Sequence, residues 1–410
     1  MITGIVTERT DLFDVSILIA MRISIKGKLS ENDLKTAFEK AVKTHEILNS
    51  HVVIEADGSA FYESDSENSP GGNSFVFEEN SWMDIIKREE KIRFKLEEGQ
   101  FLKAFCYERN EAGCSILFLL HHLGGDGKSL CYFIETFMRI LAGEEPEYKE
   151  LVTIPAGDLS DEALKDRVGP LAAVPKIYNK KWKDDKECRL FGFEDMDAAY
   201  EEYWKDRESD IKEIVIPSRT VAKILKRCKE WKIGFTAYIT TAFLRRMGRK
   251  LDIGYAVDAR EDGNRCMGNQ ATGISIKYAY DYNKPFKKNA LKVQKLLTGK
   301  LEDDGARMFI LPFMSAFEPG LRDALNLEHA GTYHSKTSGK LAKLLGYGDK
   351  TKDLSITNLT RLDIPIIYGD YELEFFSFIP PVISYGKNII GLSTLGDVTV
   401  MTIHRVKKLS

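Results

Sequence analysis

The sequence predicts an α/β protein made of two sandwich-like halves, each with helices laid against a mixed sheet. Two observations support this fold class. First, 410 residues exceed what one hydrophobic core usually supports, which indicates about two domains. Second, strand-like and helix-like segments recur in both halves of the chain, as helices packed on mixed sheets require. We expect one domain over residues 1–185 and another over residues 186–410, with the boundary placed to about twenty residues.

The composition is that of an ordinary globular protein and excludes several functions. Hydrophobic residues make up 43% of the chain and charged residues 30%, while the net charge is only -3. So small a charge does not steer the chain toward a polyanion, and we expect no nucleic-acid partner. The apolar run at residues 15–21 is too short to span a bilayer, and it lacks the features of a signal peptide. We therefore expect a soluble cytoplasmic protein without a transmembrane segment.

The cysteines and the short motifs give no sign of a bound metal or nucleotide. Six cysteines occur without a C-x-x-C pair or a regular spacing, which disfavours both a zinc site and a disulfide framework. The chain also lacks G-x-G-x-x-G behind a strand, G-x-x-x-x-G-K-[ST], H-E-x-x-H and G-x-S-x-G. We expect no metal and no covalently bound cofactor.

Strand and helix patterns alternate in the first half of the chain. Residues 18–27 form a strand candidate, and the helix that follows has Ser30 as N-cap and Asp33 three residues later. Apolar residues continue this helix at helical spacing to residue 42. Extended runs come next, at residues 47–55, 74–80, 101–109 and 114–122, with a loop over residues 64–73. The last run is apolar on successive residues, as expected of a strand covered on both faces.

A tight turn and a second helix come directly after that strand. An apolar stripe at helical spacing runs from Leu130 to Leu141, and Gly143 is a helix stop. The sequence is charged and irregular from about residue 144 to residue 210, and we interpret this stretch as the crossover between the halves.

The second half repeats the mixture of helices and strands, without a convincing internal repeat. Two helices joined by Gly234 follow its first strand. The predicted strands cover residues 212–217, 252–260, 272–280, 354–359, 371–379 and 388–404, and the predicted helices cover residues 218–232, 235–250 and 289–303.

The stretch "HHLGGDGKSL", residues 121–130, brings together two adjacent histidines, three glycines and an aspartate. Successive side chains on a strand point to opposite faces, so His121 and His122 cannot share a metal ion in extended geometry. The same stretch is similar to the L-G-G-[DH]-S-L around the serine that takes a phosphopantetheine arm. Here two extra residues precede Ser129, and the stretch follows a buried strand instead of lying in a small helical bundle. We set the carrier-protein interpretation aside.

The geometry allows one histidine to be buried and the other to face a cleft at the end of the strand. Glycines at this point let the backbone turn sharply and let a substrate approach closely. An imidazole can take a proton from an alcohol or amine at neutral pH, which contributes roughly 10²–10⁴-fold to a rate. From the residues alone, a buried core histidine and a catalytic one remain equally open.

"HHLGGDG" resembles the H-H-x-x-x-D-G signature of the CoA-dependent acyltransferase superfamily. This superfamily includes chloramphenicol acetyltransferase, plant acyltransferases, alcohol acetyltransferases and the condensation domains of nonribosomal peptide synthetases. Four further segments resemble the family in order, from about Asp11 to Pro365: "KTHEIL", "KIGFTAYITTAFL", "AVDAR" with "MGNQATGISI", and "LSITNLTRLDIP". The resemblance implies two chloramphenicol-acetyltransferase-like α/β sandwich halves with an active-site tunnel between them.

The resemblance also implies roles for the residues of the motif. His122 would be the general base, which takes the proton from the acceptor as it attacks a thioester carbonyl and returns it to the leaving thiol. We expect the ring of His122 to lie at the domain interface and to face a tunnel open on both sides. The backbone N–H of Gly127 and the hydroxyl of Ser129 are candidates for the oxyanion donor.

Other residues of the site are implied to be structural. Asp126 would pair with Arg260 and hold the shape of the loop, and His121 would be a packing or hydrogen-bonding residue. Asn269 and Asn358, in the matched segments, are candidates for the substrate tunnel.

Departures from the family pattern narrow the expected activity. "LDIPIIYG" stands where plant acyltransferases carry D-F-G-W-G, which disfavours that branch and its phenolic substrates. Thr360 replaces the expected glycine of the "NLTRLD" segment. Chloramphenicol acetyltransferase is about half as long and builds its site across a trimer, whereas this chain supplies both halves, so we expect a monomer.

Three functions follow, in order of preference. The first is an acyltransferase that uses an acyl-CoA as co-substrate and a small-molecule alcohol or amine as acceptor. The second is a freestanding condensation enzyme that takes its acyl thioester from a phosphopantetheinyl carrier protein and forms an amide or ester. The third is a non-catalytic binding protein that keeps the fold, which the presence of His122 disfavours.

Overall fold

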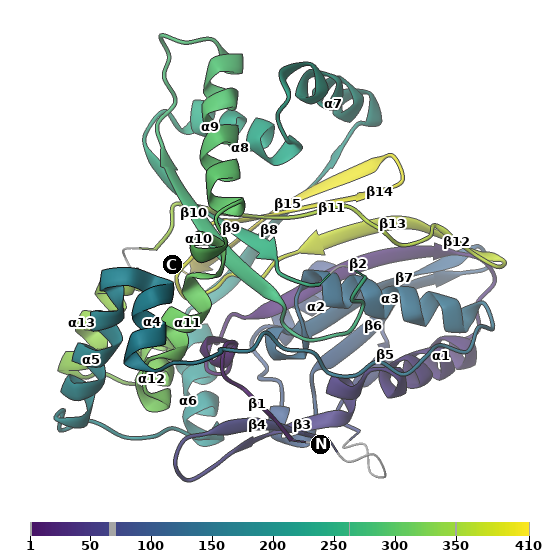
Figure 1. The fold of residues 1–410 in the computed structure, drawn as a ribbon. Helices are drawn as coiled ribbons and strands as arrows, with labels where there is room; N and C mark the ends of the chain where they lie inside the picture. Colours follow the sequence, from purple (N-terminus) through teal and green to yellow (C-terminus); the bar gives the residue numbers. More distant parts are fainter. Residues whose placement is uncertain (1, 65–70, 262, 349–350, 410) are drawn as a thin grey trace.

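The computed structural model describes residues 2–64, 71–261, 263–348 and 351–409, so the predicted loop over residues 64–73 lies largely outside it. Over these residues the strands form two six-stranded mixed sheets and a small sheet in the order β1-β4-β3 (Figure 1). The first large sheet has the order β12-β13-β2-β7-β6-β5, and the second has the order β10-β9-β11-β14-β15-β8. The predicted fold class, two α/β halves of the chloramphenicol acetyltransferase type, is confirmed.

The first sheet is covered by two helices packed on each other, α1 (Glu31–Thr44) and α3 (Gly127–Leu141). Ser30 caps α1 as predicted, because its side chain accepts from the N–H of Asp33 and Asp33 in turn accepts from the N–H of Ser30. The strands of this sheet are β2 (Leu18–Lys26), β5 (Ser74–Phe77), β6 (Leu102–Asn110), β7 (Gly113–His121), β12 (Ile367–Tyr368) and β13 (Tyr371–Ile379).

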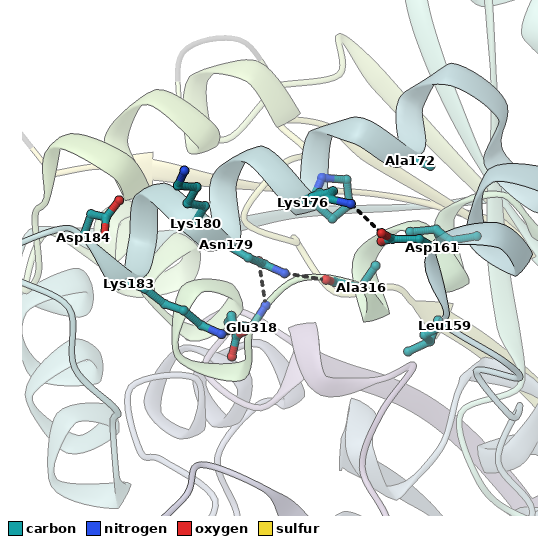
Figure 2. A pocket seen from close by; sticks show the side chains of 12 residues that line it. Leu159, Asp161, Ala172, Lys176, Asn179, Lys180, Lys183, Asp184, Ala316 and Glu318 are labelled. Atoms are coloured by element: carbon teal, nitrogen blue, oxygen red, sulfur yellow. Dashed lines mark hydrogen bonds and ion pairs between the residues drawn. The ribbon is translucent and has the colours of Figure 1, made fainter.

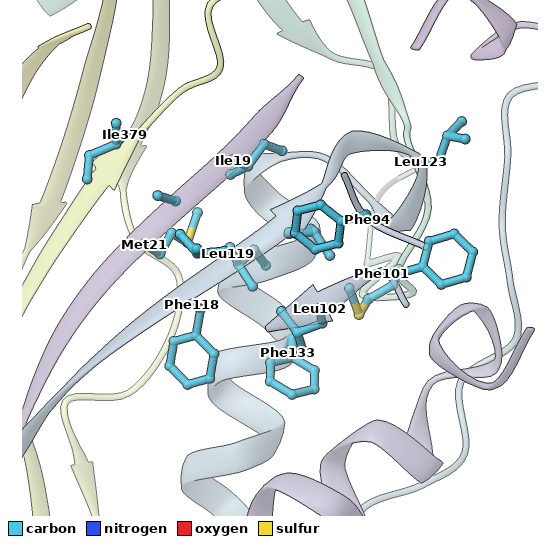
Figure 3. Close-up of a cluster of buried hydrophobic side chains, with 14 of the residues drawn as sticks. Ile19, Met21, Phe94, Phe101, Leu102, Phe118, Leu119, Leu123, Phe133 and Ile379 are labelled. Carbon is cyan, nitrogen blue, oxygen red and sulfur yellow. The ribbon is translucent and has the colours of Figure 1, made fainter. Parts of the chain in front are cut away.

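Aromatic rings pack these helices on the sheet, and Figure 3 shows Phe118 and Phe133 among the buried side chains. Phe133 of α3 lies edge-on to Phe118 of β7 and to Phe38 of α1, at 5.9 Å between ring centroids in both pairs. Edge-to-face pairs of this kind add roughly 0.5–1.5 kcal/mol beyond the area that they bury. The core therefore fixes the direction in which β7 and α3 meet, and this is where the histidine motif lies.

The second sheet carries its own helices and its own core. α8 packs on α9, and the buried residues Leu244, Ile253 and Ile390 belong to one hydrophobic cluster on this side of the molecule. The helices are α7 (Ser218–Trp231), α8 (Phe235–Met247) and α9 (Phe286–Leu301), and the strands are β8 (Arg207–Ile216), β9 (Leu251–Asp258), β10 (Ala271–Tyr278), β11 (Leu354–Arg361), β14 (Ile389–Leu395) and β15 (Val398–Lys408).

The stretch over residues 144–210, interpreted as an irregular crossover, is helical over part of its length. It contains α4 (Asp161–Val168), α5 (Ala173–Lys183) and α6 (Phe193–Trp204), which pack against α11 (Ile310–Ser315), α12 (Pro319–Ala330) and α13 (Lys336–Leu345). The expectation of irregular structure was wrong, whereas the crossover between the halves stays a prediction. In α4 only Leu164 and Val168 are buried, so charged side chains hide the helical spacing.

The chain crosses between the two sheets near its C-terminal end. β13 pairs with β2, so a strand from residues 371–379 completes the first sheet. The division into residues 1–185 and 186–410 stays a prediction. The remaining elements are β1 (Ile2–Gly4), β3 (Ser50–Ile54), β4 (Ala60–Ser64), α2 (Trp82–Glu89) and α10 (Asp304–Met308). Among the described residues, no helix has the length and apolar character needed to cross a membrane.

Candidate active site

The histidine motif forms a turn between β7 and α3, and we call residues 121–127 the motif turn. β7 ends at His121, a short 3₁₀ helix spans His122–Gly124, and α3 begins at Gly127. Gly125 lies in this turn with a φ of +147°, and a Cβ there would come within 2.5 Å of the Cβ of Ser129. The turn thus requires glycine at this position, both for its backbone angle and for the space beside it.

His121 is buried and serves as a packing and hydrogen-bonding residue. Its ring lies edge-on to Phe94 at 5.8 Å, and its Nδ1 accepts from the backbone N–H of Leu123 at 3.2 Å. Burial lowers the pKa of His121 to about 3, so the ring is neutral and its proton lies on Nε2. This arrangement agrees with the structural role implied by the sequence.

His122 is more open, and it lies against an acidic side chain. Its side chain is 17% exposed, and its Nδ1 lies 3.4 Å from Oδ2 of Asp11. Asp11 ends the 3₁₀ helix Arg9–Asp11 near the start of the chain. Burial raises the pKa of Asp11 to about 6, although the nearby ring of His122 and a hydrogen bond from Asn269 oppose this rise. No sequence motif had pointed to a role for Asp11.

Asp126 caps α3 and joins the two sides of the molecule. Its Oδ1 accepts from the N–H of Ser129 at 3.0 Å and from the guanidinium of Arg260 at 2.8 Å, as the resemblance implied. Asp126 is buried, which favours the neutral carboxyl, but Arg260 and these hydrogen bonds together lower its pKa below the ordinary value. A carboxylate held in this way stays ionised, and its purely structural role stays a prediction.

Three consecutive residues just before β10 form hydrogen bonds with the motif turn, the start of α3 and Asp11. We call these three residues the 268–270 clamp. The carbonyl of Gly268 accepts from the Ser129 hydroxyl at 2.8 Å, and the N–H of Gln270 donates to Oδ2 of Asp126 at 3.0 Å. Between them, the side chain of Asn269 donates to Oδ2 of Asp11 at 2.7 Å. The clamp therefore contacts the helix start, its cap and the neighbour of His122.

The two oxyanion candidates, Gly127 and Ser129, stay predictions, and their surroundings differ. The Ser129 hydroxyl is fully buried, donates to Gly268 and accepts from Arg260 at 2.7 Å, so its proton is already in use. Gly127 is the first residue of α3, where N–H groups have no partner within the helix and carry a partial positive charge. A Cβ at Gly127 would also crowd Leu359 and Phe378, each at 3.1 Å.

Asn358, the other residue predicted for the tunnel, forms its hydrogen bonds with residues of the second sheet and of the helix α8. Its Nδ2 donates to the hydroxyl of Thr236 at 3.0 Å, and its Oδ1 accepts from the N–H of Thr360 at 2.8 Å. Thr360 itself has a φ of +61°, in the left-handed region that favours glycine. The backbone thus explains why the resembling segments carry glycine where this chain has threonine.

Two cavities of the molecule lie elsewhere. One, of about 490 Å³, is lined by α4, α5 and the residues around Glu318, and Lys176 pairs with Asp161 across it (Figure 2). The other, of about 770 Å³, lies beside Cys106 and Cys114. A tunnel past His122 remains a prediction. The described residues hold no group of three or more His, Cys, Asp or Glu side chains suited to a metal ion.

Comparison with known sequences gives a local likeness. No family model matches the chain. The hybrid PKS-NRPS synthetase LUC5 of a Fusarium species is 29% identical over 129 residues, which is 30% of this chain. The match covers 3% of that synthetase, so the chain corresponds to a small part of this relative.

Comparison with solved structures gives likenesses over nearly the whole chain. The first condensation domain of the CDA synthetase has a TM-score of 0.63 at 12% identity, over 98% of this chain and 89% of that one. Polyketide synthase associated protein 5 from Mycobacterium tuberculosis has a TM-score of 0.60 at 14% identity, over 98% and 94%. The epimerization domain from the third module of tyrocidine synthetase B has a TM-score of 0.59 at 12% identity, over 100% and 93%.

Proposed function

We propose that this chain, which has the condensation-domain fold with two chloramphenicol-acetyltransferase-like halves, is an acyltransferase with His122 as general base. It would move an acyl group from an acyl-CoA thioester to a hydroxyl or amine acceptor. The observation that carries the proposal is the contrast between the two adjacent histidines. His121 is buried and bonded, whereas His122 is partly exposed at the end of β7, with its Nδ1 facing a carboxylate.

The reaction can be written on the residues of the motif turn. Nε2 of His122 takes the proton of the acceptor as its oxygen or nitrogen attacks the thioester carbonyl. The oxyanion that forms is stabilised by backbone N–H groups at the start of α3, for which Gly127 is the candidate. When the carbon–sulfur bond breaks, the thiolate receives the proton from His122, which leaves an ester or amide and a free thiol.

Most of the acceleration would come from holding both substrates side by side. Oriented reactants gain effective molarities up to roughly 10⁵–10⁸ M, while general-base help adds roughly 10²–10⁴-fold. Asp126 does not compete for the role of base, because its two oxygens accept from Arg260, Ser129 and Gln270.

A carrier-protein-bound acyl thioester is the second candidate for the donor. The solved structures that resemble this chain include a condensation domain and an epimerization domain of synthetases, and the local sequence likeness is to a hybrid PKS-NRPS synthetase. The chemistry at the carbonyl would be the same, because both donors present a phosphopantetheine thioester. The two donors would differ outside the site, where either the nucleotide part of CoA or the surface of the carrier protein would contact the chain.

The test is release of free thiol from acyl donors in the presence of a panel of alcohols and amines. Donors are acetyl-CoA, longer acyl-CoAs and an acylated phosphopantetheinyl carrier protein. We expect His122→Ala to lose turnover roughly 100-fold or more while remaining folded and still binding the thioester. His51→Ala is the matched control, since His51 lies on β3 and pairs with Glu63.

The outcomes separate the candidates. Wild-type turnover in His122→Ala would refute the role of His122. Turnover with the carrier protein and none with any acyl-CoA would replace the first donor by the second. Binding of thioesters without turnover from any donor would favour a non-catalytic binding protein.

A further inference from the structure

Asp11 is a buried carboxylate beside His122 to which the proposed reaction gives no task. It comes from a 3₁₀ turn 111 residues before the histidine in sequence, and its side chain is 13% exposed. Nδ1 of His122 is buried and has no hydrogen-bond partner among the residues that the structure describes. Oδ2 of Asp11, at 3.4 Å, is thus the acceptor within reach of this nitrogen.

The position of the carboxylate is fixed from the opposite side of the molecule. Asn269 of the 268–270 clamp donates to the same oxygen, Oδ2, at 2.7 Å. Gly268 and Gln270 on either side are bonded to Ser129 and Asp126, so Asn269 has little freedom to move. Asp11 and His122 are therefore brought together by a contact that spans both halves.

The separation of 3.4 Å exceeds that of an ordinary hydrogen bond. Catalytic hydrogen bonds are often long before substrate binds and shorten in the complex. The pair is significant because the Asp11 carboxylate and the Nδ1 atom of His122 are both buried, and a carboxylate out of water interacts strongly with a nearby imidazolium. The pKa of Asp11 reflects this contact, since His122 opposes the rise to about 6 that burial causes.

We propose that Asp11, oriented by Asn269, is a positioning residue that holds the proton of neutral His122 on Nδ1 and leaves Nε2 free to act as base. A neutral imidazole carries one N–H, and the acceptor at one nitrogen decides where it lies. The same carboxylate stabilises the imidazolium that forms when Nε2 takes the acceptor's proton. This catalytic consequence rests on the proposed function, whereas the position of the proton does not.

The tautomer can be measured without any turnover. In protein labelled with ¹⁵N-histidine, long-range ¹H–¹⁵N spectra at mildly alkaline pH distinguish Nδ1–H from Nε2–H, and loss of a signal in His122→Gln assigns the ring among seven histidines. We expect Nδ1–H in the wild type and a shift of the proton toward Nε2 in Asp11→Ala. Asp14→Asn is the control, because Asp14 is another buried carboxylate of the same segment, and its oxygens accept from Ser16 and Ser384.

A second variant keeps the test decisive if Asp11→Ala fails to fold. Asn269→Ala leaves the carboxylate in place but removes the bond that orients it, so the proton should shift in the same direction by less. An Nε2–H tautomer in the wild type would overturn the inference, and so would a tautomer that neither variant alters.

Kinetics then test the consequence for the base. If the chain turns over a thioester, Asp11→Ala should lower kcat by about tenfold or more with little change in KM, because the contact matters most once His122 is charged. Absence of turnover with every donor would contradict the proposed function and would leave the tautomer result standing. Unchanged kcat in an active enzyme would contradict the positioning role.

Discussion

The carboxylate of Asp126 and the guanidinium of Arg260 lie 2.8 Å apart, with side chains only 6% and 4% exposed. This pair joins the motif turn to the segment that follows β9. Without Asp126, the buried guanidinium of Arg260 keeps Asp258, 3.0 Å away and 36% exposed, as a carboxylate partner. The loss should therefore approach but not exceed the roughly 3–5 kcal/mol that a fully broken buried pair costs. We expect Asp126→Ala to lower the melting temperature and the activity together. Loss of activity with an unchanged melting temperature would contradict the structural role.

A side chain at Gly268 of the 268–270 clamp is expected to destabilise the folded protein. Its φ is +140°, and a Cβ there would lie 2.0 Å from the carbonyl oxygen of Val152. Gly268→Ala should cost more than the roughly 1–3 kcal/mol of a strained backbone, because the chain must also move away. Thermal unfolding measures the loss. Gly263→Ala is the control, since Gly263 has a φ of +81° with nothing within 4 Å, and equal losses in both variants would contradict the clash.

Thr360 offers a stabilising substitution. A β-branched residue at a φ of +61° is strained, and glycine relieves that strain at the expense of greater freedom in the unfolded chain. We expect Thr360→Gly to raise the free energy of unfolding by about 1 kcal/mol, measured by chemical denaturation. Thr357→Gly, within the regular part of β11, should instead destabilise. The hydroxyl of Thr360 makes only a long contact of 3.4 Å with the carbonyl of Arg361, so a loss of stability in Thr360→Gly would contradict the strain at this residue.

Asp11 predicts how stability depends on pH. Its folded-state pKa of about 6 lies above its ordinary value, so the folded protein holds this proton more tightly than the unfolded chain. The contribution of Asp11 to stability therefore falls as pH rises from about 4 to about 6, and above that it remains a cost of roughly 2–3 kcal/mol. Asp11→Asn cannot ionise and should avoid this cost.

Denaturation curves for both proteins across this pH range check the prediction. We expect Asp11→Asn to gain stability over the wild type as the pH rises, and to lose this advantage near pH 4, where Asp11 is protonated in the folded state and half-protonated in the unfolded chain. An advantage that does not change with pH would contradict ionisation of Asp11 as its cause. A stabilised variant with impaired turnover would show that the carboxylate is kept for its effect on His122.

Local sequence patterns predicted the parts of the site that lie close together along the chain. The strand, turn and helix around His122 follow from apolar spacing and glycines, and the partnership of Asp126 with Arg260 followed from the resemblance of two motifs. Asp11 could not be found in this way, because its acidic and apolar neighbours carry no pattern that points to a histidine 111 residues later. Only the folded chain, through Asn269, brings these side chains together.

For the fold, too, the sequence predicted local elements but not how these elements are arranged. Periodicity identified the strand over residues 371–379, since its alternation is local, but the sheet that it joins depends on the whole molecule. α4 and α5 were missed because each buries only two residues and exposes many charged side chains. α6 buries five residues at helical spacing, Met196, Ala199, Tyr200, Tyr203 and Trp204, and its pattern was overlooked within a charged stretch.

The pairing of β13 with β2 has a consequence for how the protein is made. During synthesis β2, β7 and α3 leave the ribosome early, but the strand that covers the open edge of β2 is about 350 residues behind it. Until then Leu18–Lys26 presents unpaired N–H and C=O groups, which are a template for pairing with another chain. The first sheet therefore cannot mature as an independent unit, and nascent chains stalled before residue 371 should aggregate or occupy chaperones.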